Sequence, residues 1–351
     1  MMSLDSYRTL GPTGLRVSPL CLGAMTFGSE VLGTDEGTSH ELIARYTAAG
    51  GNFIDTANGY SQGRSEEVIG AYLAGHKDLR DRLVIATKFA ANLFPGDPNG
   101  GGTGRKAILH QVEGSLRRLG TDYIDLYWQH NLDRHTPVEE TMSTLDDLVR
   151  AGKIRYIGLS DTPAWAVAHA ATIAGFRGWT GVAAIQVEYS LLERTVEGEL
   201  FGAARAFGLG VTPWSPLANG LLSGKYTRDD PAPAGSNRAH HVASRLTERT
   251  FTVVEALQRI ADGLGASIAA VALAWVRQQH PVTSTIIGVR TPAQLDANLA
   301  SLDVTIPDEN LAELEALTTP HLNFPADFLE QVAVDYQQRG ATVNGVTSRA
   351  R

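Results

Sequence analysis

The feature that most constrains the fold is a regular alternation of short apolar runs and longer helix-like segments along nearly the whole chain. Most of the runs lack the polar–apolar alternation of a half-exposed strand, which is typical of parallel strands buried on both faces. Each run therefore predicts a buried strand that is followed by a covering helix. Eight such runs are present, at 20–25, 52–56, 83–89, 123–129, 154–160, 183–188, 209–215 and 284–288.

The segments that separate the runs predict amphipathic helices. Two of them begin with a polar residue and a proline, Asp161-Thr162-Pro163 and Thr291-Pro292, and proline is favoured just inside a helix start. Ser65 is a further candidate cap. The predicted helices span about 36–49, 65–74, 105–119, 138–151, 162–174, 196–207, 250–280 (interpreted as two helices) and 291–301.

Eight strand–helix repeats predict an α/β fold of the (β/α)8 TIM-barrel type, with an open doubly wound sheet as the alternative. The count of eight favours the barrel, and no G-x-G-x-x-G follows the first run. The glycine run at 100–104 lacks the Gly-Lys-Ser/Thr ending of a phosphate loop, so we interpret it as a flexible connection. Residues 7–18 predict a β-hairpin that closes one end of the barrel.

The remaining segments extend one domain rather than adding another. We expect a single barrel domain over 1–351, because no linker or internal repeat interrupts the pattern. The long polar segments 90–104 and 225–249 follow predicted strands, so they are expected on the face where barrel enzymes carry substrate loops. Residues 319–351 form a tail with a helix predicted near 325–339.

Composition narrows the class of protein. Hydrophobic residues make up 43% of the chain, enough for a large core, and the net charge of −8 argues against a nucleic-acid surface. Cys21 is the single cysteine, which fits a reducing compartment. The N-terminal sequence lacks a secretory pattern, and no run reaches the roughly 18 apolar residues of a membrane span. We expect a cytoplasmic protein without membrane or nucleic-acid partners, and the oligomeric state stays open.

Polar side chains recur at the ends of the predicted strands. Singly, each has an ordinary structural interpretation: an acid that caps a turn, a lysine in a surface pair, or a histidine satisfied in the core. Because strand ends meet at one mouth of a barrel, these groups would crowd into one cavity, and such desolvation usually marks function. The strand-end residues are Asp55, Lys88, His130, Ser160, Asp161, Gln186, Trp214, Ser215, Gly288 and Arg290.

Tyr60, five residues after Asp55 in FIDTANGY, adds a proton donor to this set. A tyrosine pKa of about 10 is too high for efficient proton donation at neutral pH. The ammonium of Lys88 would lower that pKa, and Asp55 would keep the lysine charged. A neutral His130 could orient a substrate oxygen. The set is suited to protonating a carbonyl oxygen or deprotonating an alcohol.

The segments FIDTANGY, IATKF and DLYWQH resemble the catalytic tetrad of the aldo-keto reductase superfamily. The resemblance runs from LGPTGLRVSPLCLGAMTFG to IIGVRTPAQLDANL, and the long loops look closest to its bacterial and potassium-channel β-subunit branch. It implies a (β/α)8 barrel, a carbonyl or alcohol substrate, NADPH or less often NADH as cofactor, and no metal. It also implies that Tyr60 is the general acid/base, that Asp55 and Lys88 tune it, and that His130 steers the carbonyl.

The same resemblance implies where the cofactor and substrate bind. Asp161 stands where many members carry asparagine, and Arg290 is the one obvious cation at the adenosine end, which favours NADPH over NADH. Side chains near the mouth that could shape the substrate pocket are Met25, Phe89, Phe94 and Trp128. The implied cofactor residues are Gly23, Met25, Asp55, Ser160, Asp161, Gln186, Trp214, Ser215, Pro216, Leu217, Asn219, Gly220, Gly288, Arg290, Gln294 and Asn298.

Three other functions stay open. A redox-sensing regulatory subunit could share this fold and cofactor, although no docking segment stands out. A metal-dependent hydrolase is suggested by QHNLDRH at 129–135 and by His240–His241, but these histidines do not form a convergent three-ligand pattern. An aldolase that forms a Schiff base on Lys88 would leave Trp214 and Arg290 without a purpose.

Overall fold

Eight parallel strands form one sheet in the order β10-β3-β4-β5-β6-β7-β8-β9. The computed structural model describes residues 2–29, 33–231, 233 and 242–349. Each strand lies within one or two residues of a predicted run. Their bounds are β3 Leu20–Gly23, β4 Phe53–Asp55, β5 Val84–Phe89, β6 Ile124–Gln129, β7 Ile154–Ser160, β8 Val182–Glu188, β9 Gly210–Trp214 and β10 Thr285–Gly288.

The two outer strands of this order also meet. Val211 of β9 forms a parallel bridge with Val282, just before β10, and the Thr283 backbone N–H donates to the Val211 carbonyl at 2.8 Å. The sheet therefore closes on itself, and closure removes both open edges. The predicted (β/α)8 barrel is confirmed, and the open doubly wound sheet is excluded.

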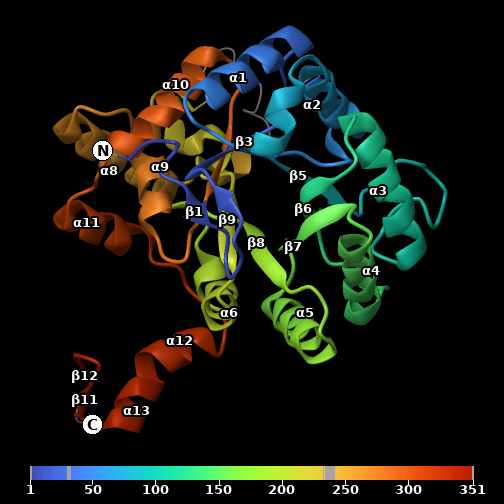
Figure 1. Cartoon of the computed structure of the whole chain (residues 1–351). Helices are drawn as coiled ribbons and strands as arrows, with labels where there is room; N and C mark the ends of the chain where they lie inside the picture. Colours follow the sequence, from blue (N-terminus) through green and yellow to red (C-terminus); the bar gives the residue numbers. More distant parts are fainter. Residues whose placement is uncertain (1, 30–32, 232, 234–241, 350–351) are drawn as a thin grey trace.

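The helices surround the barrel as an outer ring (Figure 1). The predicted helix at 196–207 is shorter, because a 3-10 turn occupies Thr195–Glu197 before α6. The predicted pair at 250–280 is confirmed: Gly265 at φ 62° ends the first helix, and the Ser267 side chain caps the second. The bounds are α1 Glu36–Ala48, α2 Arg64–Gly75, α3 Arg105–Leu119, α4 Val138–Arg150, α5 Ala164–Arg177, α6 Leu200–Phe207, α8 Glu248–Leu264, α9 Ile268–Gln278, α10 Pro292–Leu299 and α11 Asp308–Thr318.

The predicted N-terminal hairpin closes one end of the barrel, opposite the C-terminal ends of the strands. β1 (Arg8–Thr9) pairs antiparallel with β2 (Arg16–Val17), and the side chains of Leu10 and Val17 are buried in the barrel interior. Gly11 in the turn has φ +58°, and a Cβ there would lie 2.1 Å from the Ala183 carbonyl oxygen. Only glycine allows the hairpin to approach β8 this closely.

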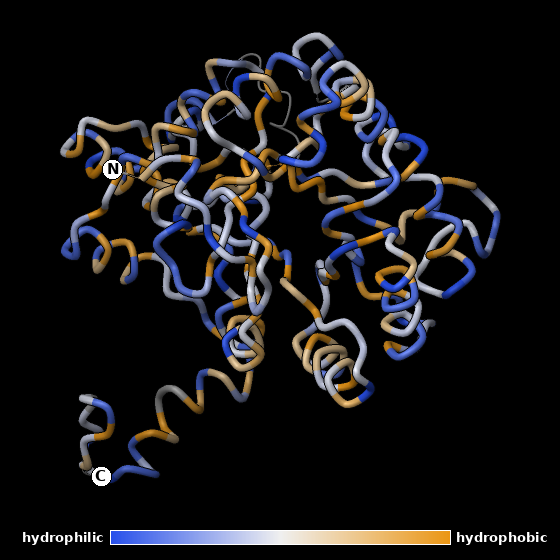
Figure 2. The backbone as a smooth tube through the Cα atoms, viewed as in Figure 1, coloured by the Kyte–Doolittle hydropathy of each residue, from blue (hydrophilic) through white to orange (hydrophobic). Residues whose placement is uncertain are grey.

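Large side chains fill the barrel interior. The fully buried Trp128 lies so close to β7 that a Cβ on Gly158 would come within 2.1 Å of its ring. The strands are largely hydrophobic along their length (Figure 2). The interior is therefore packed. Its cluster comprises Leu10, Val17, Cys21, Phe53, Val84, Ala86, Leu126, Trp128, Ala184 and Ile286.

The C-terminal tail projects away from the barrel (Figure 1). Its helical part is continuous in sequence, from α12 (Ala326–Phe328) through a π-helical turn (Leu329–Ala333) to α13 (Val334–Gln338), which confirms the helix predicted near 325–339. A small hairpin of β11 (Thr342–Val343) and β12 (Val346–Thr347) follows.

Within the described residues, no single helix is long and apolar enough to cross a membrane. α8 and α9 meet the criteria of length and composition only when taken together, and they bend by 97° where they join. Most residues of α9 are buried in the hydrophobic core of the protein.

Candidate active site

A buried ion pair forms the base of the candidate site. Asp55 ends β4 and Lys88 lies on the neighbouring β5, and the Lys88 ammonium is fully buried against the Asp55 carboxylate. The ammonium also donates to the Thr56 carbonyl at 2.9 Å and to the Tyr60 hydroxyl at 3.2 Å. These three acceptors use all three N–H groups of the lysine. Burial lowers the pKa of Lys88, but Asp55 and Tyr60 outweigh burial, so that its pKa is raised and the ammonium stays charged.

Tyr60 is brought over this pair by a sharp reversal of the chain. It begins a 3-10 segment, Tyr60–Gly63, in which Ser61 and Gln62 adopt left-handed φ values of 47° and 54°. The reversal returns the phenol toward the end of β5, where Lys88 meets it. The five-residue gap after Asp55 therefore allows the ammonium to contact both the acid and the phenol.

Ser65 does not cap α2 as expected, because the N-cap is Gly63 at φ 94°. The buried Ser65 hydroxyl instead donates to the Ala24 carbonyl at 2.7 Å and lies 2.7 Å from the Thr56 hydroxyl. It links the loop after β3 to the loop after β4. The backbone around the tyrosine is thus held from two neighbouring strands.

The pKa of Tyr60 is raised, which differs from the expectation that Lys88 lowers it. Burial of the phenol is the largest cause, and Lys88 acts in the opposite direction, while Asp55 and Asp161 raise the pKa further. The lysine therefore offsets part of a desolvation effect that it does not overcome. At rest the phenol is protonated, and it can donate its proton or a hydrogen bond to a ligand in the cavity.

His130 faces Tyr60 from the loop after β6. Its backbone N–H donates to the Phe89 carbonyl at 3.1 Å, and its ring meets the Tyr60 ring edge to face, with 5.7 Å between centroids. Burial and the charge of Lys88 lower the pKa of His130 to about 3. The imidazole is therefore neutral near pH 7, as expected from the sequence.

β7 and β8 present two more polar groups at paired positions. Ser160 and Gln186 are direct neighbours in the register of the two strands. The Gln186 amide donates to the second oxygen of Asp55 at 3.1 Å, whereas the buried Ser160 hydroxyl has no hydrogen-bond partner among the described residues. A buried hydroxyl without a partner is costly, so Ser160 is suited to a ligand that supplies one.

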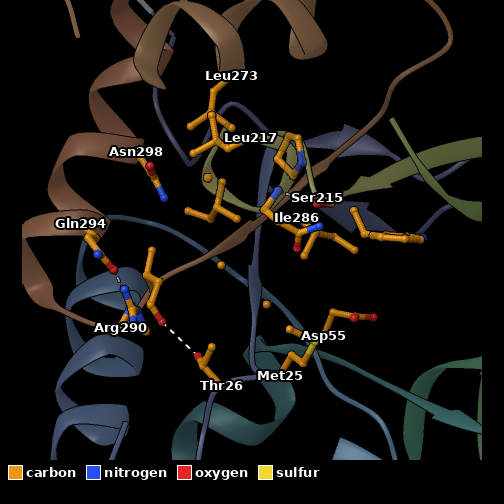
Figure 3. Close-up of a pocket in the computed structure, with 18 of the residues that line it drawn as sticks. Met25, Thr26, Asp55, Ser215, Leu217, Leu273, Ile286, Arg290, Gln294 and Asn298 are labelled. Atoms are coloured by element: carbon orange, nitrogen blue, oxygen red, sulfur yellow. Dashed lines mark hydrogen bonds between the residues drawn. The ribbon is translucent and has the colours of Figure 1, made fainter. Parts of the chain in front are cut away.

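A cavity of about 530 Å³ opens above the buried ion pair. One end of it is lined by Asp55, Tyr60, His130, Ser160 and Gln186. Figure 3 shows Asp55 and Met25 toward one end and Arg290, Gln294 and Asn298 toward the other. The Arg290 backbone N–H donates to the Gln294 side chain at 2.8 Å. All the expected cofactor residues line this cavity: Gly23, Met25, Asp55, Ser160, Asp161, Gln186, Trp214, Ser215, Pro216, Leu217, Asn219, Gly220, Gly288, Arg290, Gln294 and Asn298.

The wall between the two ends is built from left-handed backbone. Ser215, Ala218, Asn219 and Gly220 have φ values of 54°, 48°, 59° and 93°. The backbone N–H groups of Ala218 and Gly220 donate to the carbonyls of Ser215 and Leu217, and that of Asn219 donates to the Ser215 hydroxyl, so the turn is held from within. Lys225 lines the same part of the cavity, and its ammonium would lie 3.1 Å from a Cβ on Gly220. The wall therefore combines a tightly turned backbone with a cation.

Three side chains expected at the substrate pocket do not line the cavity. Phe89 follows Lys88 on β5, so the pleat turns it outward, where its ring packs 4.8 Å from Tyr127. Trp128 fills the barrel interior below the mouth. Phe94 is half exposed beside His110. Of the expected pocket residues, Met25 alone lines the described cavity.

Other lining residues were not expected from the sequence. Lys225 could have been suspected, because it is a cation directly after the segment PWSPLANGLLSG. Apolar residues of α9 and β10 carry no polar signal that would mark them. The unexpected lining residues are Thr26, Ser223, Lys225, Ala269, Leu273, Ile286, Ile287, Val289 and Ala297.

In the described part of the chain, no group of three or more His, Cys, Asp or Glu side chains is placed to hold a metal ion. The Asp133 carboxylate of QHNLDRH accepts hydrogen bonds from the backbone N–H groups of Thr103 and His135 and from the Thr136 hydroxyl. It therefore organises its own loop. His240 and His241 lie outside the described residues.

Comparisons with known proteins identify the family of the chain. The model of the Aldo/keto reductase family matches residues 19–319. An uncharacterized oxidoreductase of Bacillus subtilis is 39% identical over 88% of this chain and 94% of its own length. A norsolorinic acid reductase of Emericella nidulans is 36% identical, and an aryl-alcohol dehydrogenase of Pestalotiopsis microspora is 34% identical; each match covers 93% of this chain and 85% of the relative. The chain belongs to the aldo/keto reductase family and is an oxidoreductase of carbonyl and alcohol substrates.

Proposed function

We propose that this oxidoreductase uses NADPH to interconvert aromatic aldehydes or ketones and their alcohols, with Tyr60 as general acid/base. The observation that carries the proposal is the hydrogen bond from the Lys88 ammonium to the Tyr60 hydroxyl. It lies at the end of the cavity that Asp55, Tyr60 and His130 line, which we call the inner end. The same ammonium is held by Asp55. The Tyr60 phenol, the Lys88 ammonium and the neutral His130 ring lie together, and they can transfer a proton without a metal.

The residues of the cavity fit a dinucleotide along its length. The buried Ser160 hydroxyl has no partner among the described residues, and together with Gln186 and the Trp214 indole it suits the nicotinamide and its carboxamide. The Lys225 ammonium, beside the tight turn at 215–220, suits the pyrophosphate. Arg290, with Gln294 and Asn298, suits the adenosine end, and a guanidinium favours a 2′-phosphate, which supports NADPH over NADH. When bound, the cofactor supplies or accepts the hydride.

The side chains of the site supply the proton and the orientation. In the direction of reduction, the Tyr60 hydroxyl gives its proton to the carbonyl oxygen, and the resulting tyrosinate is stabilised by the Lys88 ammonium 3.2 Å away. Asp55 keeps that ammonium charged while it is buried. The neutral His130 ring holds the substrate oxygen beside the phenol. In the direction of oxidation the same groups act in reverse.

Aromatic substrates are proposed from the relatives. Two of the similar proteins carry the names aryl-alcohol dehydrogenase and norsolorinic acid reductase. The exposed Met25 thioether lines the cavity near Asp55 and offers a polarizable surface for a ring. A position in the potassium-channel β-subunit branch and a location in the cytoplasm are also proposals, since they rest on the long loops and on composition.

The test is consumption of NADPH, followed by its near-ultraviolet absorbance, against a panel of aromatic and aliphatic aldehydes. We expect turnover with aromatic aldehydes, and a loss of about 10²–10⁴-fold in kcat for Tyr60→Phe, which removes only the hydroxyl. NADPH binding by Tyr60→Phe should be unchanged. Tight binding of NADPH by the wild type without turnover of any aldehyde or alcohol would instead support the redox-sensing regulatory subunit.

A further inference from the structure

The charges at the inner end of the cavity do not cancel. Lys88 and Asp55 neutralise each other in their buried ion pair, and the lowered pKa of His130 keeps its ring neutral. Tyr60 is protonated, as its raised pKa requires. Asp161 also lines this part of the cavity, and within the described residues no lysine or arginine forms an ion pair with it. The inner end therefore carries one net negative charge.

The Asp161 carboxylate is held in place. Asp161 directly follows Ser160 and has φ 42°, a left-handed conformation that aspartate and asparagine tolerate better than most residues. Its backbone N–H donates to the Gln186 carbonyl at 3.1 Å, and the Trp214 indole N–H donates to its carboxylate at 3.0 Å. Burial raises the pKa of Asp161, while the Trp214 indole N–H and the charge of Lys88 act in the opposite direction and favour the ionised carboxylate. The carboxylate is thus positioned among Ser160, Gln186 and Trp214.

We propose that Asp161 selects the oxidation state of the cofactor, by stabilising the cationic nicotinamide ring of NADP+ relative to the neutral ring of NADPH. The inference rests on the proposed function, because Ser160, Gln186 and Trp214 are the residues that would surround that ring. In the reaction, alcohol and NADP+ give carbonyl, NADPH and a proton, so the ring loses its positive charge when the alcohol is oxidised. Asp161 therefore shifts the preference for the bound cofactor toward NADP+.

Asparagine at this position separates the charge from the other roles of Asp161. An amide oxygen can still accept the Trp214 indole N–H, and asparagine tolerates the same backbone conformation. A purely structural role for Asp161 is therefore retained in Asp161→Asn, whereas an electrostatic role is lost. Asp161→Glu keeps the charge and should preserve the preference.

The experiment measures the dissociation constants of NADP+ and NADPH by isothermal titration calorimetry, without substrate. For Asp161→Asn we expect affinity for NADP+ to fall about tenfold, equivalent to about 1.4 kcal/mol, and affinity for NADPH to change less than about twofold. Asp161→Glu should stay within about threefold of the wild-type ratio of the two constants. Glu188→Gln is the matched control, because Glu188 is paired with Arg245 at 3.1 Å and does not line the cavity.

Each result has one consequence. A ratio of the two constants that Asp161→Asn leaves unchanged overturns the inference, while the proposed function stands. An equal change in Glu188→Gln also overturns it, since the effect would then come from the general charge of this face. Should Asp161→Asn fail to fold, a ratio in Asp161→Glu that differs tenfold from wild type decides against the inference. Wild-type protein that binds neither nucleotide refutes the proposed function itself.

Discussion

Replacement of Lys88 by methionine tests the buried ion pair most directly. The side chains of Lys88 and Asp55 are 0% and 3% exposed, so solvent screens their interaction little. Removing one partner of such a pair leaves an uncompensated buried charge and costs about 3–5 kcal/mol. That is a large part of a typical total stability of about 5–15 kcal/mol. We therefore expect Lys88→Met to lower the free energy of unfolding by about 3–5 kcal/mol near pH 8.

The sign of the pH dependence follows from where the variant binds a proton. Without the ammonium, a proton on the buried Asp55 carboxyl stabilises the folded variant. The folded variant therefore binds this proton more tightly than the unfolded chain does. Stability that comes from a proton held in the folded state is present at low pH and lost as pH rises. The deficit of Lys88→Met relative to wild type should accordingly be smaller near pH 5 than near pH 8.

Urea unfolding followed by tryptophan emission measures these differences. The double variant Lys88→Met/Asp55→Asn removes both charges and should be more stable than Lys88→Met alone. Arg105→Met is the matched control, because its pair with Asp147 is about half exposed (50% and 48%) and should cost less than about 1 kcal/mol. A Lys88→Met variant within about 1 kcal/mol of wild type near pH 8, or a double variant less stable than the single one, would refute the reasoning.

Three further predictions concern packing, protonation and the cofactor. Gly158→Ala should lower the free energy of unfolding by about 1–3 kcal/mol, because its Cβ meets the Trp128 ring. Gly202→Ala lies in open space on α6 and should raise the free energy of unfolding by about 0.5–1 kcal/mol. Thermal unfolding of the two variants measures both changes. The pKa of His130 falls from 6.5 to about 3 on folding, so stability from its neutral ring is lost as pH drops below about 6.5. When pH falls from 7 to 5, the free energy of unfolding should drop by about 2 kcal/mol less in His130→Gln than in wild type, as measured by urea unfolding. Arg290→Ala should weaken NADPH binding at least tenfold and NADH binding less than threefold, and equal losses in titrations of both would count against the phosphate contact.

The order of elements was readable from the sequence because burial on both faces of a parallel strand leaves a continuous apolar run. Several of these runs carry a polar residue at or near their end, which placed Asp55, Lys88 and Gln186 at one end of a barrel. Errors arose where local rules compete with packing. Ser65 follows the pattern of a helix cap, yet its hydroxyl bonds to the Ala24 carbonyl of a neighbouring loop. Phe89 is one residue from Lys88, and the pleat directs it to the opposite face.

Sequence alone determined the fold class, the residues at the strand ends and the spacing of Asp55 and Tyr60, because these depend on local periodicity and chain order. Tertiary structure decided everything that depends on the total environment of a group. The pKa of Tyr60 is raised because burial outweighs Lys88, and no sequence pattern records how deeply a phenol is buried. Lys225 and Leu273 join the cavity from a later loop and from α9. The unbalanced charge of Asp161 became visible only once the partners of Lys88 and Glu188 were known, since charges cancel through space and not along the chain.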